Sequence, residues 1–458
     1  MPKYMQAVSE DRKSQTQIQL ARVQALLGSG TAHQLRQMVR GLLPVQIARL
    51  LESSPPTSRR IIWDLVNKNM LGEVLEELPE EIRAEFLVDI EAEDLAQLGE
   101  GLDTDDLVDI LQQLPEQLTQ EVLAGMKQQD RERVEKVIAY DEDTAGGLTN
   151  TDTITVRPRY TLDVVLRYLR RHPTLPDSTD SLIVVNRKDD YLGLLPLSTL
   201  LTTDPNVTVR EVMVTDTNAI RANLSETEVA KLFEEHDWIS APVVDDKGTL
   251  IGRITIDDVV DVIRDNADHS LMSLAGLTED DDTFAPIWKT TPRRAIWLGI
   301  NLITALLASM VIDQFKDTID KVVALAVLMP LVASMGGVAG SQTLTMIIRG
   351  MSTGQIGPNN LRWLLSRELG VGLINGMLWA VVIGTVSAFW FQDYRFAIII
   401  GIAMIVNLAT AAIAGALIPP LLKSFKIDPA LAGGVTLTTL TDVVGYLAFL
   451  GLATYFFA

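Results

Sequence analysis

Five apolar stretches follow one another from about residue 290 to the end of this 458-residue chain. They cover residues 295–312, 322–348, 371–391, 396–422 and 431–457, with short connections between them. A hydrocarbon core of about 30 Å is crossed by about 20 helical residues, and each stretch is long enough to do so. The sequence therefore predicts an integral membrane domain of five transmembrane helices over residues 291–458.

Asp442 lies near the middle of the last apolar stretch. An ionised carboxylate at the bilayer centre costs at least ~2.5 kcal/mol, and a chain keeps one where it faces a bundle interior or a water-filled path. There the carboxylate can meet a cation. The alternative is a carboxylate buried against a basic partner, for which the apolar stretches contain few candidates. We expect Asp442 to lie on an ion path.

Basic residues at the flanks of the apolar stretches predict their orientation. If the soluble half is cytoplasmic, the inner flanks hold more Lys and Arg than the outer flanks, as the positive-inside rule requires. The inner residues are Lys289, Arg293, Arg294, Arg349, Arg362, Arg367, Lys423 and Lys426, and the outer ones are Lys316, Lys321 and Arg395. We expect a multi-pass protein of the inner (plasma) membrane, with a cytoplasmic N-terminus and an extracellular or periplasmic C-terminus. Five helices are few for an ion path, so we also expect a homodimer with the path near its symmetry axis.

Charge is divided unevenly between the two halves of the chain. Residues 285–458 hold 11 Lys+Arg and 7 Asp+Glu; the whole chain has 39 and 59, which leaves 28 and 52 for residues 1–284. An acidic soluble half argues against a nucleic-acid binder, which needs basic patches for phosphates. It suits a protein that meets cations, although acidic soluble domains are common.

Residue types restrict the chemistry further. The chain has no cysteine, which excludes disulfides and thiolate metal sites. Its histidines, His33, His172, His236 and His269, lack ligand spacing, so any metal must be held by carboxylate and backbone oxygens, which favours Mg²⁺, Ca²⁺ or Mn²⁺. The sequence contains neither a nucleophile–base pairing nor a phosphate-binding glycine loop that would indicate an enzyme. The first fifteen residues are polar, so we expect no signal peptide.

Residues 1–140 read as a succession of short helices. Apolar residues recur at helical spacing, as in Leu107, Ile110, Leu111 and Leu114, and Asp or Pro begins a new helix about every 12 residues. This pattern predicts an acidic helical N domain folded as a compact superhelix. We expect its exposed faces to carry Asp89, Glu91, Glu93, Asp94, Asp103, Asp105, Asp106 and Asp109.

Residues 141–266 contain an internal repeat. Residues 191–200 (YLGLLPLSTL) match residues 250–259 (LIGRITIDDV), with Gly193 aligned to Gly252. A strand-like run precedes each copy, and an amphipathic helical pattern precedes each run. The pair resembles tandem CBS domains (β-α-β-β-α), a regulatory module that often dimerises. The predicted fold class is thus a multidomain α and α/β integral membrane protein.

Two membrane segments carry motifs. In the second stretch Pro330 is followed by SMGGVAGSQ, in which Gly336, Gly337 and Gly340 allow close helix approach and local unwinding, or serve packing alone. The last stretch opens with DPALAGG from residue 428 and places four hydroxyls near Asp442, although such hydroxyls often bond to their own backbone. These are Thr436, Thr438, Thr439 and Thr441.

With these motifs the chain resembles the MgtE family of magnesium channels over nearly its full length. The order of parts agrees, with an N domain (1–140), tandem CBS domains (141–266), a connecting or plug helix (267–290) and five membrane helices (291–458). The motifs P-x₅-GG-x-x-G-x-Q, from Pro330 to Gln342, and DPA…T-x-x-D-x-x-G, from Asp428 to Gly445, are both present. The sequence departs from the expected pattern at Val338 and Gly434, where members often have Asn.

The resemblance implies a role for Asp442 as the pore carboxylate that holds hydrated Mg²⁺. Mg²⁺ usually keeps several waters, which carbonyls near Gly434 and the Thr438 and Thr441 hydroxyls could accept from. The pore-lining residues that we expect are Gly434, Thr438, Thr441, Asp442, Gly445, Gly336, Gly337 and Val338.

The resemblance also implies closure by cytosolic Mg²⁺ bound between the N and CBS domains. Asp237, Asp258 and Asp261 match the sensing carboxylates of the family, and Asp257 lies beside them. We name Asp106 and Asp109 as the N-domain partners. After Asp261, where further acids are expected, the chain has Arg264 and Asn266.

Other functions stay open. Thr255 and Asp258 form an [ST]-x-x-D pattern of the kind that CBS domains use for adenosine nucleotides, so ATP is a candidate modulator. The first repeat, with Pro196, Ser198 and Thr199, lacks the Asp. The rivals to a Mg²⁺ channel are a CBS-regulated transporter of another divalent cation (Co²⁺, Mn²⁺) and a non-conducting membrane sensor.

Overall fold

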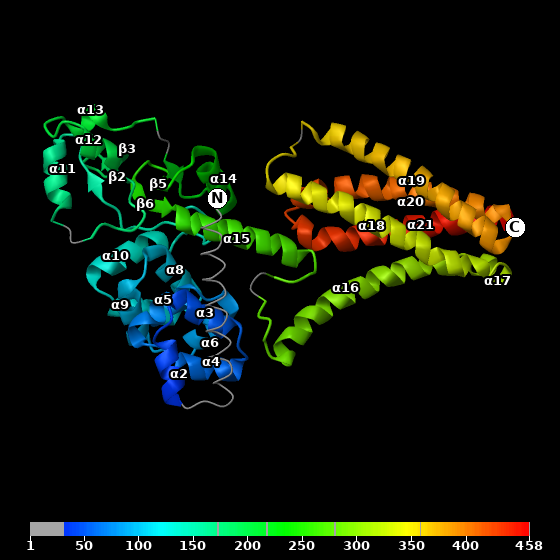
Figure 1. Cartoon of the computed structure of the whole chain (residues 1–458), viewed down its shortest axis with the longest axis horizontal. Coiled ribbons are helices and arrows are strands. Elements are labelled where there is room, and N and C mark those ends of the chain that lie inside the picture. Colours follow the sequence, from blue (N-terminus) through cyan, green and yellow to red (C-terminus); the bar gives the residue numbers. More distant parts are fainter. Residues whose placement is uncertain (1–31, 172–173, 217–218, 279–280, 358, 458) are drawn as a thin grey trace. The chain divides into compact units, whose positions relative to one another are not determined.

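The computed structural model describes residues 32–457, apart from 172–173, 217–218, 279–280 and 358. The polar first fifteen residues and His172 lie outside the described residues. The chain forms two compact units (Figure 1). One consists of Met1–Asp268 with Asp280–Pro286, and the other of His269–Glu279 with Ile287–Ala458.

The N domain is helical, as predicted. Its helices are α2 (Ala32–Val39), α3 (Pro44–Glu52), α4 (Pro56–Trp63), α5 (Leu71–Glu76), α6 (Glu80–Leu87), α7 (Ala92–Leu98), α8 (Thr104–Gln112), α9 (Glu116–Gly125) and α10 (Gln128–Val137). Proline is the first residue of α3 and α4 and directly precedes α6 and α9, where its fixed φ favours helix initiation. The apolar faces enclose one core that includes Ile47, Leu50, Leu75, Leu111 and Val122.

Two three-stranded sheets confirm the predicted repeat. The first contains β1 (Thr155–Val156), β2 (Ser181–Val185) and β3 (Tyr191–Pro196), with α11 (Leu162–Leu169), α12 (Leu197–Thr202) and α13 (Val209–Val212). The second contains β4 (Ile220–Arg221), β5 (Ser240–Val244) and β6 (Leu250–Thr255), with α14 (Glu226–His236) and α15 (Ile256–Ser273). In each sheet the first strand pairs parallel and the third antiparallel to the middle strand.

The two aligned glycines of the repeat, Gly193 and Gly252, are needed for the same structural reason. A Cβ on Gly193 would lie 2.3 Å from the Val214 carbonyl oxygen, and a Cβ on Gly252 would lie 2.3 Å from the Asn150 carbonyl oxygen. In both sheets a further segment therefore approaches the third strand closely, with Val214 bonded to Leu194 and Asn150 to Arg253. A side chain at either glycine would block this pairing.

The predicted connecting helix at 267–290 takes a different form. Helix α15 runs without a break from Ile256 to Ser273, so the expected boundary at residue 266 falls inside it. Gly276 follows with φ +73°, and a Cβ there would lie 2.9 Å from the Trp297 ring. The next helix begins at Ile287.

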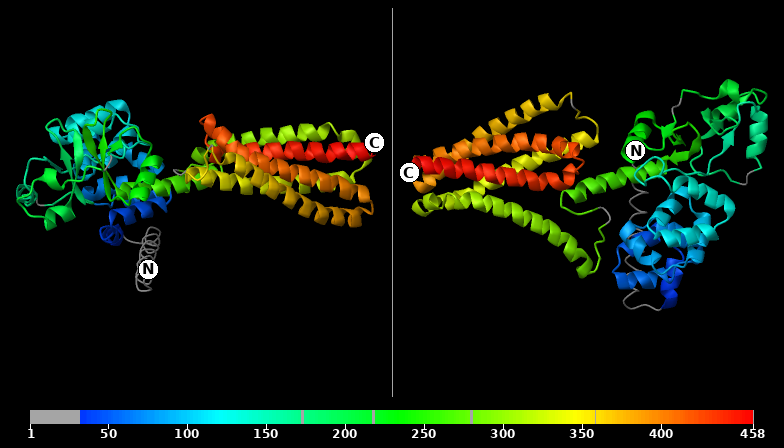
Figure 2. Two further views of the ribbon diagram at one scale, coloured as in Figure 1. Left: turned by 90° about the horizontal axis from the view of Figure 1, so that it is seen from above. Right: turned by 180° about the vertical axis from the view of Figure 1, so that it is seen from behind.

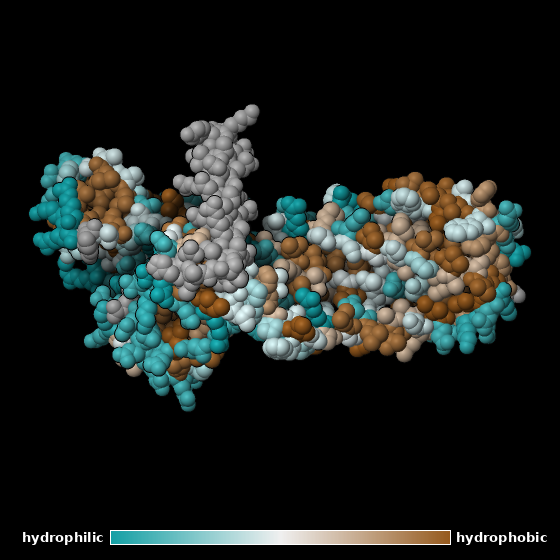
Figure 3. Space-filling model, turned by 60° about the horizontal axis from the view of Figure 1, so that its bottom comes forward, coloured by the Kyte–Doolittle hydropathy of each residue, from teal (hydrophilic) through white to brown (hydrophobic). Residues whose placement is uncertain are grey.

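The membrane unit contains the five predicted long helices, each apolar enough to cross a bilayer (Figure 2). They are α16 (Ile287–Asp313), α18 (Ala324–Ser352), α19 (Leu361–Phe391), α20 (Tyr394–Ser424) and α21 (Pro429–Phe457), and the short α17 (Lys316–Lys321) joins the first two. On the face that Figure 3 shows, these helices carry large hydrophobic patches with paler and hydrophilic residues between them. Helix α18 continues through Pro330 and the glycine motif, so of the two alternatives for these glycines the structure shows helix packing and no local unwinding. Helix α20 is the most buried of the five and packs against α18, α19 and α21.

Candidate ion path and cation-sensing site

Asp442 is partly exposed on α21. Within the described part of the chain, its carboxylate makes no hydrogen bond and no ion pair. The alternative of a carboxylate buried against a basic partner therefore finds no such partner among these residues. A membrane helix that exposes an unpaired carboxylate needs water, a cation or another subunit beside it.

The threonine hydroxyls near Asp442 bond to their own helix. Thr438 Oγ1 donates to the Gly434 carbonyl at 2.8 Å, and Thr441 Oγ1 donates to the Thr438 carbonyl at 3.0 Å. Thr436 and Thr439 do the same one turn back along the helix. Each hydroxyl still has lone pairs with which it can accept from a water.

Burial divides the predicted pore-lining residues of α21 into two groups. Thr441 is fully buried, and Gly445 packs against Asn407, so both lie inside the bundle of this subunit. Gly434 and Thr438 are accessible and precede Asp442 by eight and four residues, which places all three near one face of the helix. Gly434, Thr438 and Asp442 are thus the predicted pore-lining residues of α21 that share an accessible face.

The glycine motif of α18 likewise contains both buried and accessible residues. Gly336 is buried against Asn407, and Gly340 is buried against Leu437 of α21. Gly337 has open space where a Cβ would stand, and Val338 is 56% exposed. Close helix approach is thus the role of the first and third glycines, while Gly337 and Val338 remain accessible.

Two buried polar residues of the membrane helices escaped the sequence analysis. Glu368 on α19 is 4% exposed; its carboxylate accepts from Arg367 Nη1 at 2.6 Å and from Thr343 Oγ1 at 3.3 Å. It lies just before the predicted start of the third stretch at residue 371, where hydropathy alone does not place it in the membrane. Asn407 lies inside the fourth stretch, and its polar side chain was the signal that could have revealed it.

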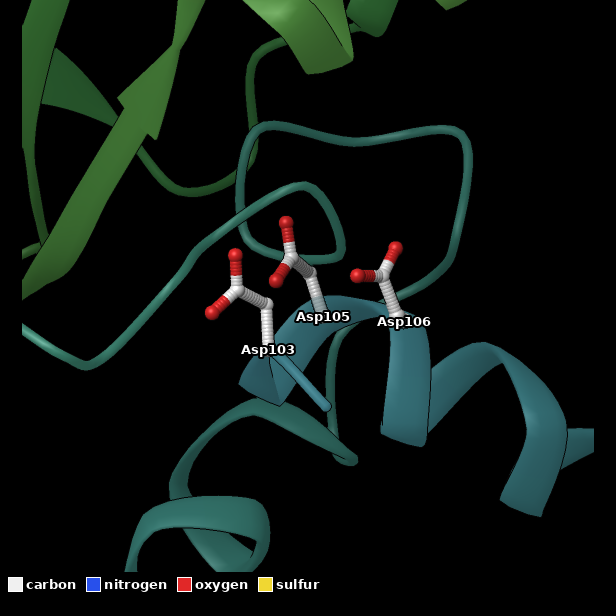
Figure 4. Close-up of side chains that lie close together, drawn as sticks. All are labelled: Asp103, Asp105 and Asp106. Atoms are coloured by element: carbon white, nitrogen blue, oxygen red, sulfur yellow. The ribbon is translucent and has the colours of Figure 1, made fainter. Parts of the chain in front are cut away.

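Three acidic residues gather at the start of α8. The carboxylates of Asp103, Asp105 and Asp106 offer oxygens that lie within 4.8 Å of one another (Figure 4). Asp105 is only 6% exposed, and its Oδ1 has no hydrogen-bond partner among the described residues. The prediction of an exposed face was therefore wrong for Asp105, because the first turn of α8 is covered.

Asp258, in the first turn of α15, lies close to this acidic cluster. Its Oδ2 accepts from the Thr255 hydroxyl at 2.7 Å and from the Thr255 backbone N–H at 3.2 Å. Burial raises the pKa of Asp258 to about 6, against the lowering effect of these bonds. Burial also raises the pKa of Asp105 well above its usual range, and the charge of Asp258 adds to the shift.

The two residues that we named as N-domain partners lie near Asp258 too. Burial raises the pKa of Asp106 to about 9, and the charges of Glu76 and Asp258 contribute. Burial raises the pKa of Asp109 to about 7, although Arg83 partly offsets this. Burial raises the pKa of Glu76 to about 7 as well. Carboxylates from α5, α8 and α15 therefore repel one another in a poorly solvated place, which a divalent cation would relieve.

The other predicted sensing residues are placed differently. Asp261 is exposed and forms an ion pair with Arg264 at 2.8 Å, so the departure at residue 264 supplies a cation of the chain itself. Asp257 is exposed in the first turn of α15. Asp237 ends α14 in a left-handed conformation with φ 53° and is exposed. Asp237 does not figure among the main charges that shift the pKa of Asp258, Asp106 or Asp109.

The two residues of the predicted nucleotide-binding pair, Thr255 and Asp258, are hydrogen-bonded to each other. Thr255 is 5% exposed and its hydroxyl is bonded to Asp258. A nucleotide that used both side chains would have to break this hydrogen bond, and it would compete with the acidic cluster for Asp258.

Three family models match separate parts of the chain. The intracellular N domain of MgtE matches residues 42–143, the CBS domain matches residues 209–265, and the MgtE divalent cation transporter matches residues 329–452. The matches follow the order of the helical domain, the second CBS unit and the membrane helices.

Similar proteins extend over almost the whole chain. The magnesium transporter MgtE of Thermus thermophilus is 30% identical over 440 residues, which cover 94% of this chain and 97% of that protein. The magnesium transporter MgtE of Bacillus subtilis is 28% identical, with 95% and 97% covered. A crystal structure of the cytosolic domain of the Mg²⁺ channel MgtE in complex with ATP is 32% identical; it covers 53% of this chain and 99% of that one, with a TM-score of 0.48. The chain therefore belongs to the MgtE family of divalent cation transporters.

Proposed function

We propose that this protein is a Mg²⁺ channel that mediates Mg²⁺ uptake and is closed by cytosolic Mg²⁺. The observation that carries the proposal is Asp442, an acidic residue on a membrane helix, partly exposed and without a partner in the described part of its own chain. Membership of a divalent cation transporter family supports it, as does the magnesium transport named for two relatives that align over nearly the full chain.

Permeation in this proposal uses a hydrated ion. Mg²⁺ gives up its waters reluctantly, so Asp442 holds it through those waters, together with the Gly434 carbonyl and the Thr438 hydroxyl. Such contacts are weak enough to release the ion, as conduction requires. Because one subunit leaves Asp442 accessible, we place the path between two subunits of a homodimer, with one carboxylate from each. Thr441 and Gly445, both buried, support the bundle and are not in contact with the ion.

Closure in this proposal depends on the acidic cluster between the N domain and the second CBS unit. Two carboxylates a few Å apart repel by ~1–4 kcal/mol at effective dielectric constants of 80 to 20. Mg²⁺ bound by Asp106, Asp109 and Asp258 removes this repulsion and favours the associated domains. When cytosolic Mg²⁺ falls, the population shifts toward separated domains, because the ion binds only the associated form. This arrangement requires the N-terminus to be cytoplasmic, as the positive flanking charges predict.

ATP is the modulator that we propose for the CBS pair, and Thr255 and Asp258 are its candidate ligands. Because Asp258 is also one of the proposed Mg²⁺ ligands, ATP binding and domain association would be coupled. Calorimetric titration of ATP into the purified protein, with Thr255→Ala as the variant, tests this. Unchanged ATP affinity in the variant would remove Thr255 from the site.

The experiment that tests the function is Mg²⁺ uptake into proteoliposomes. The comparison includes wild type, Asp442→Asn and the control Asp320→Asn. Asp320 is an exposed acid of the short helix α17. Mg²⁺ at the face that carries the soluble unit is varied from zero to about 10 mM, a span that includes the weaker oxygen-ligand sites. We expect uptake that needs Asp442, tolerates Asp320→Asn and stops as that Mg²⁺ rises.

The other outcomes identify the rival functions. Flux of Co²⁺ or Mn²⁺ that exceeds that of Mg²⁺ would favour a transporter of another divalent cation. Uptake that Asp442→Asn leaves unchanged would remove the pore assignment. Protein that inserts and folds but conducts no ion would favour a non-conducting sensor.

A further inference from the structure

Asn407 is a fully buried amide at the junction of three membrane helices. It lies on α20, the helix that packs against α18, α19 and α21. Its Nδ2 donates a hydrogen bond to the carbonyl oxygen of Val332 on α18 at 2.7 Å. Since hydrocarbon contains no water, an amide in this position depends on such partners from neighbouring helices.

Two motif glycines form the space that holds this amide. A Cβ on Gly336 of α18 would lie 2.3 Å from Asn407 Nδ2 and 2.8 Å from its Cγ. A Cβ on Gly445 of α21 would lie 2.9 Å from Nδ2 and 3.1 Å from Cγ. Neither position can carry a side chain unless Asn407 moves. The first glycine of the pair in one motif and the final glycine of the other motif therefore lie against the same side chain.

This junction lies beside the ion path. Asp442 precedes Gly445 by three residues, which is about 4.5 Å along the helix axis. Because Gly445 is in contact with Asn407, the depth and rotation of Asp442 depend on how Asn407 is held. The hydrogen bond to Val332 supplies that hold, since it ties the amide to α18.

Packing alone does not explain why residue 407 is an amide. Its Oδ1 is buried and has no hydrogen-bond partner among the described residues. An unpaired buried oxygen carries a desolvation cost, which a leucine of nearly the same shape would avoid. The donor to Val332 thus gives a reason for an amide at this position that volume alone does not.

We propose that Asn407 is a positioning residue for ion passage. It acts through Asp442 by fixing α21 against α18, and it does not contact the ion. The proposal rests on the role of Asp442 proposed above. It predicts that loss of the Asn407 donor changes permeation more than it changes stability.

The first test is Asn407→Leu, with Asn407→Ala as a second variant should leucine prevent folding. Thermal unfolding in detergent and Mg²⁺ and Ca²⁺ fluxes in proteoliposomes are measured for each. We expect a melting temperature at or above that of wild type for Asn407→Leu, and a fall of about tenfold in Mg²⁺ flux or in the Mg²⁺ to Ca²⁺ flux ratio, the equivalent of one net hydrogen bond. Unchanged flux and an unchanged ratio in the folded variant would overturn the proposal.

The second test is a double-mutant cycle between Asn407→Ala and Gly445→Ala. Gly445→Ala alone should reduce Mg²⁺ flux, because its methyl group displaces Asn407. In the Asn407→Ala background it should reduce flux no further, because the obstruction is gone. Gly451→Ala, on the same helix with open space at its Cβ position, is the control and should match wild type. Losses that simply add would contradict the proposal.

Asp442→Asn, measured beside these variants, distinguishes failure of the pore assignment from failure of the role proposed for Asn407. If it transports as wild type does, the pore assignment fails and this proposal fails with it. If Asp442 is required while the Asn407 variants retain wild-type flux and ion ratio, the pore assignment stands and only the role of Asn407 is refuted.

Discussion

Arg59 and Asp282 form a bidentate ion pair that is closed to solvent, although 223 residues separate them in the sequence. The guanidinium nitrogens Nη1 and Nη2 lie 2.7 and 2.6 Å from the two carboxylate oxygens. The Arg59 side chain is 0% and the Asp282 side chain 3% exposed. The third donor of Arg59, Nε, bonds to the Leu51 carbonyl at 2.9 Å. Asp282, which lies five residues before the start of α16, is thereby tied to helix α4 of the N domain.

Removal of one member of this pair should be strongly destabilising. Arg59→Ala leaves Asp282 buried without its counter-charge, which costs about 3–5 kcal/mol in comparable cases. Thermal unfolding of the full-length protein in detergent measures the loss. Arg60→Ala is the matched control, because the neighbouring pair of Arg60 with Asp89 is exposed and should contribute at most about 1 kcal/mol. Equal effects of the two substitutions would show that the buried pair contributes no more than a surface pair.

The buried carboxyl groups around Asp106 predict that the unit formed by the N domain and the CBS repeat loses stability as the pH rises. Burial raises the pKa of Asp106 to about 9 and those of Asp109 and Glu76 to about 7, whereas unfolded carboxyls titrate near 4. The folded form therefore binds more protons than the unfolded form across this window, and its stability falls with increasing pH. In EDTA we expect a lower melting temperature at pH 8 than at pH 6. A melting temperature that rises over this range would contradict the assigned cause.

Mg²⁺ should act on the same groups. At pH 8 the ion replaces the lost protons, so it should raise the melting temperature of the wild type and flatten its pH dependence. Asp109→Asn or Asp258→Asn removes a ligand together with a charge that is present at pH 8, so the variant should be more stable in EDTA and respond less to Mg²⁺. Asp94→Asn, at an exposed acid of α7, is the control and should keep the wild-type response. A full Mg²⁺ response in both cluster variants would place the sensing site elsewhere.

Asp428 should stabilise the start of helix α21. Its carboxylate accepts from the backbone N–H of Ala430 at 2.9 Å and of Leu431 at 3.3 Å, and it lies 3.3 Å from His269 Nε2. Asp428→Ala removes this cap and should cost about 0.5–2 kcal/mol, whereas Asp428→Asn retains an acceptor and should cost less. Detergent melting curves give both values. A loss as large for Asn as for Ala would assign the effect to charge and not to capping.

The two glycines at residues 193 and 252 illustrate how far local sequence reaches. Their alignment predicted the repeat, and the structure confirmed it, because each strand-turn-strand unit uses neighbouring residues and needs the same close backbone approach. The five membrane helices were predicted for a similar reason, since length and hydropathy are properties of a continuous segment. Prolines at the starts of the N-domain helices are likewise local signals.

What only the tertiary structure decided is which side of each element is covered, and by what. Apolar and threonine residues are distributed around helix α21, so no periodicity in its sequence distinguishes the buried Thr441 from the accessible Thr438. Asp105 is covered by packing around α8, which an acidic pattern cannot reveal. Sequence by itself predicted the helical N domain, the repeat, the five apolar helices and the carboxylate within the last of them, because these depend on the composition of continuous segments. The burial of Asn407 and Asp105 depends on contacts between segments far apart in the chain, and only the folded structure brings those segments together.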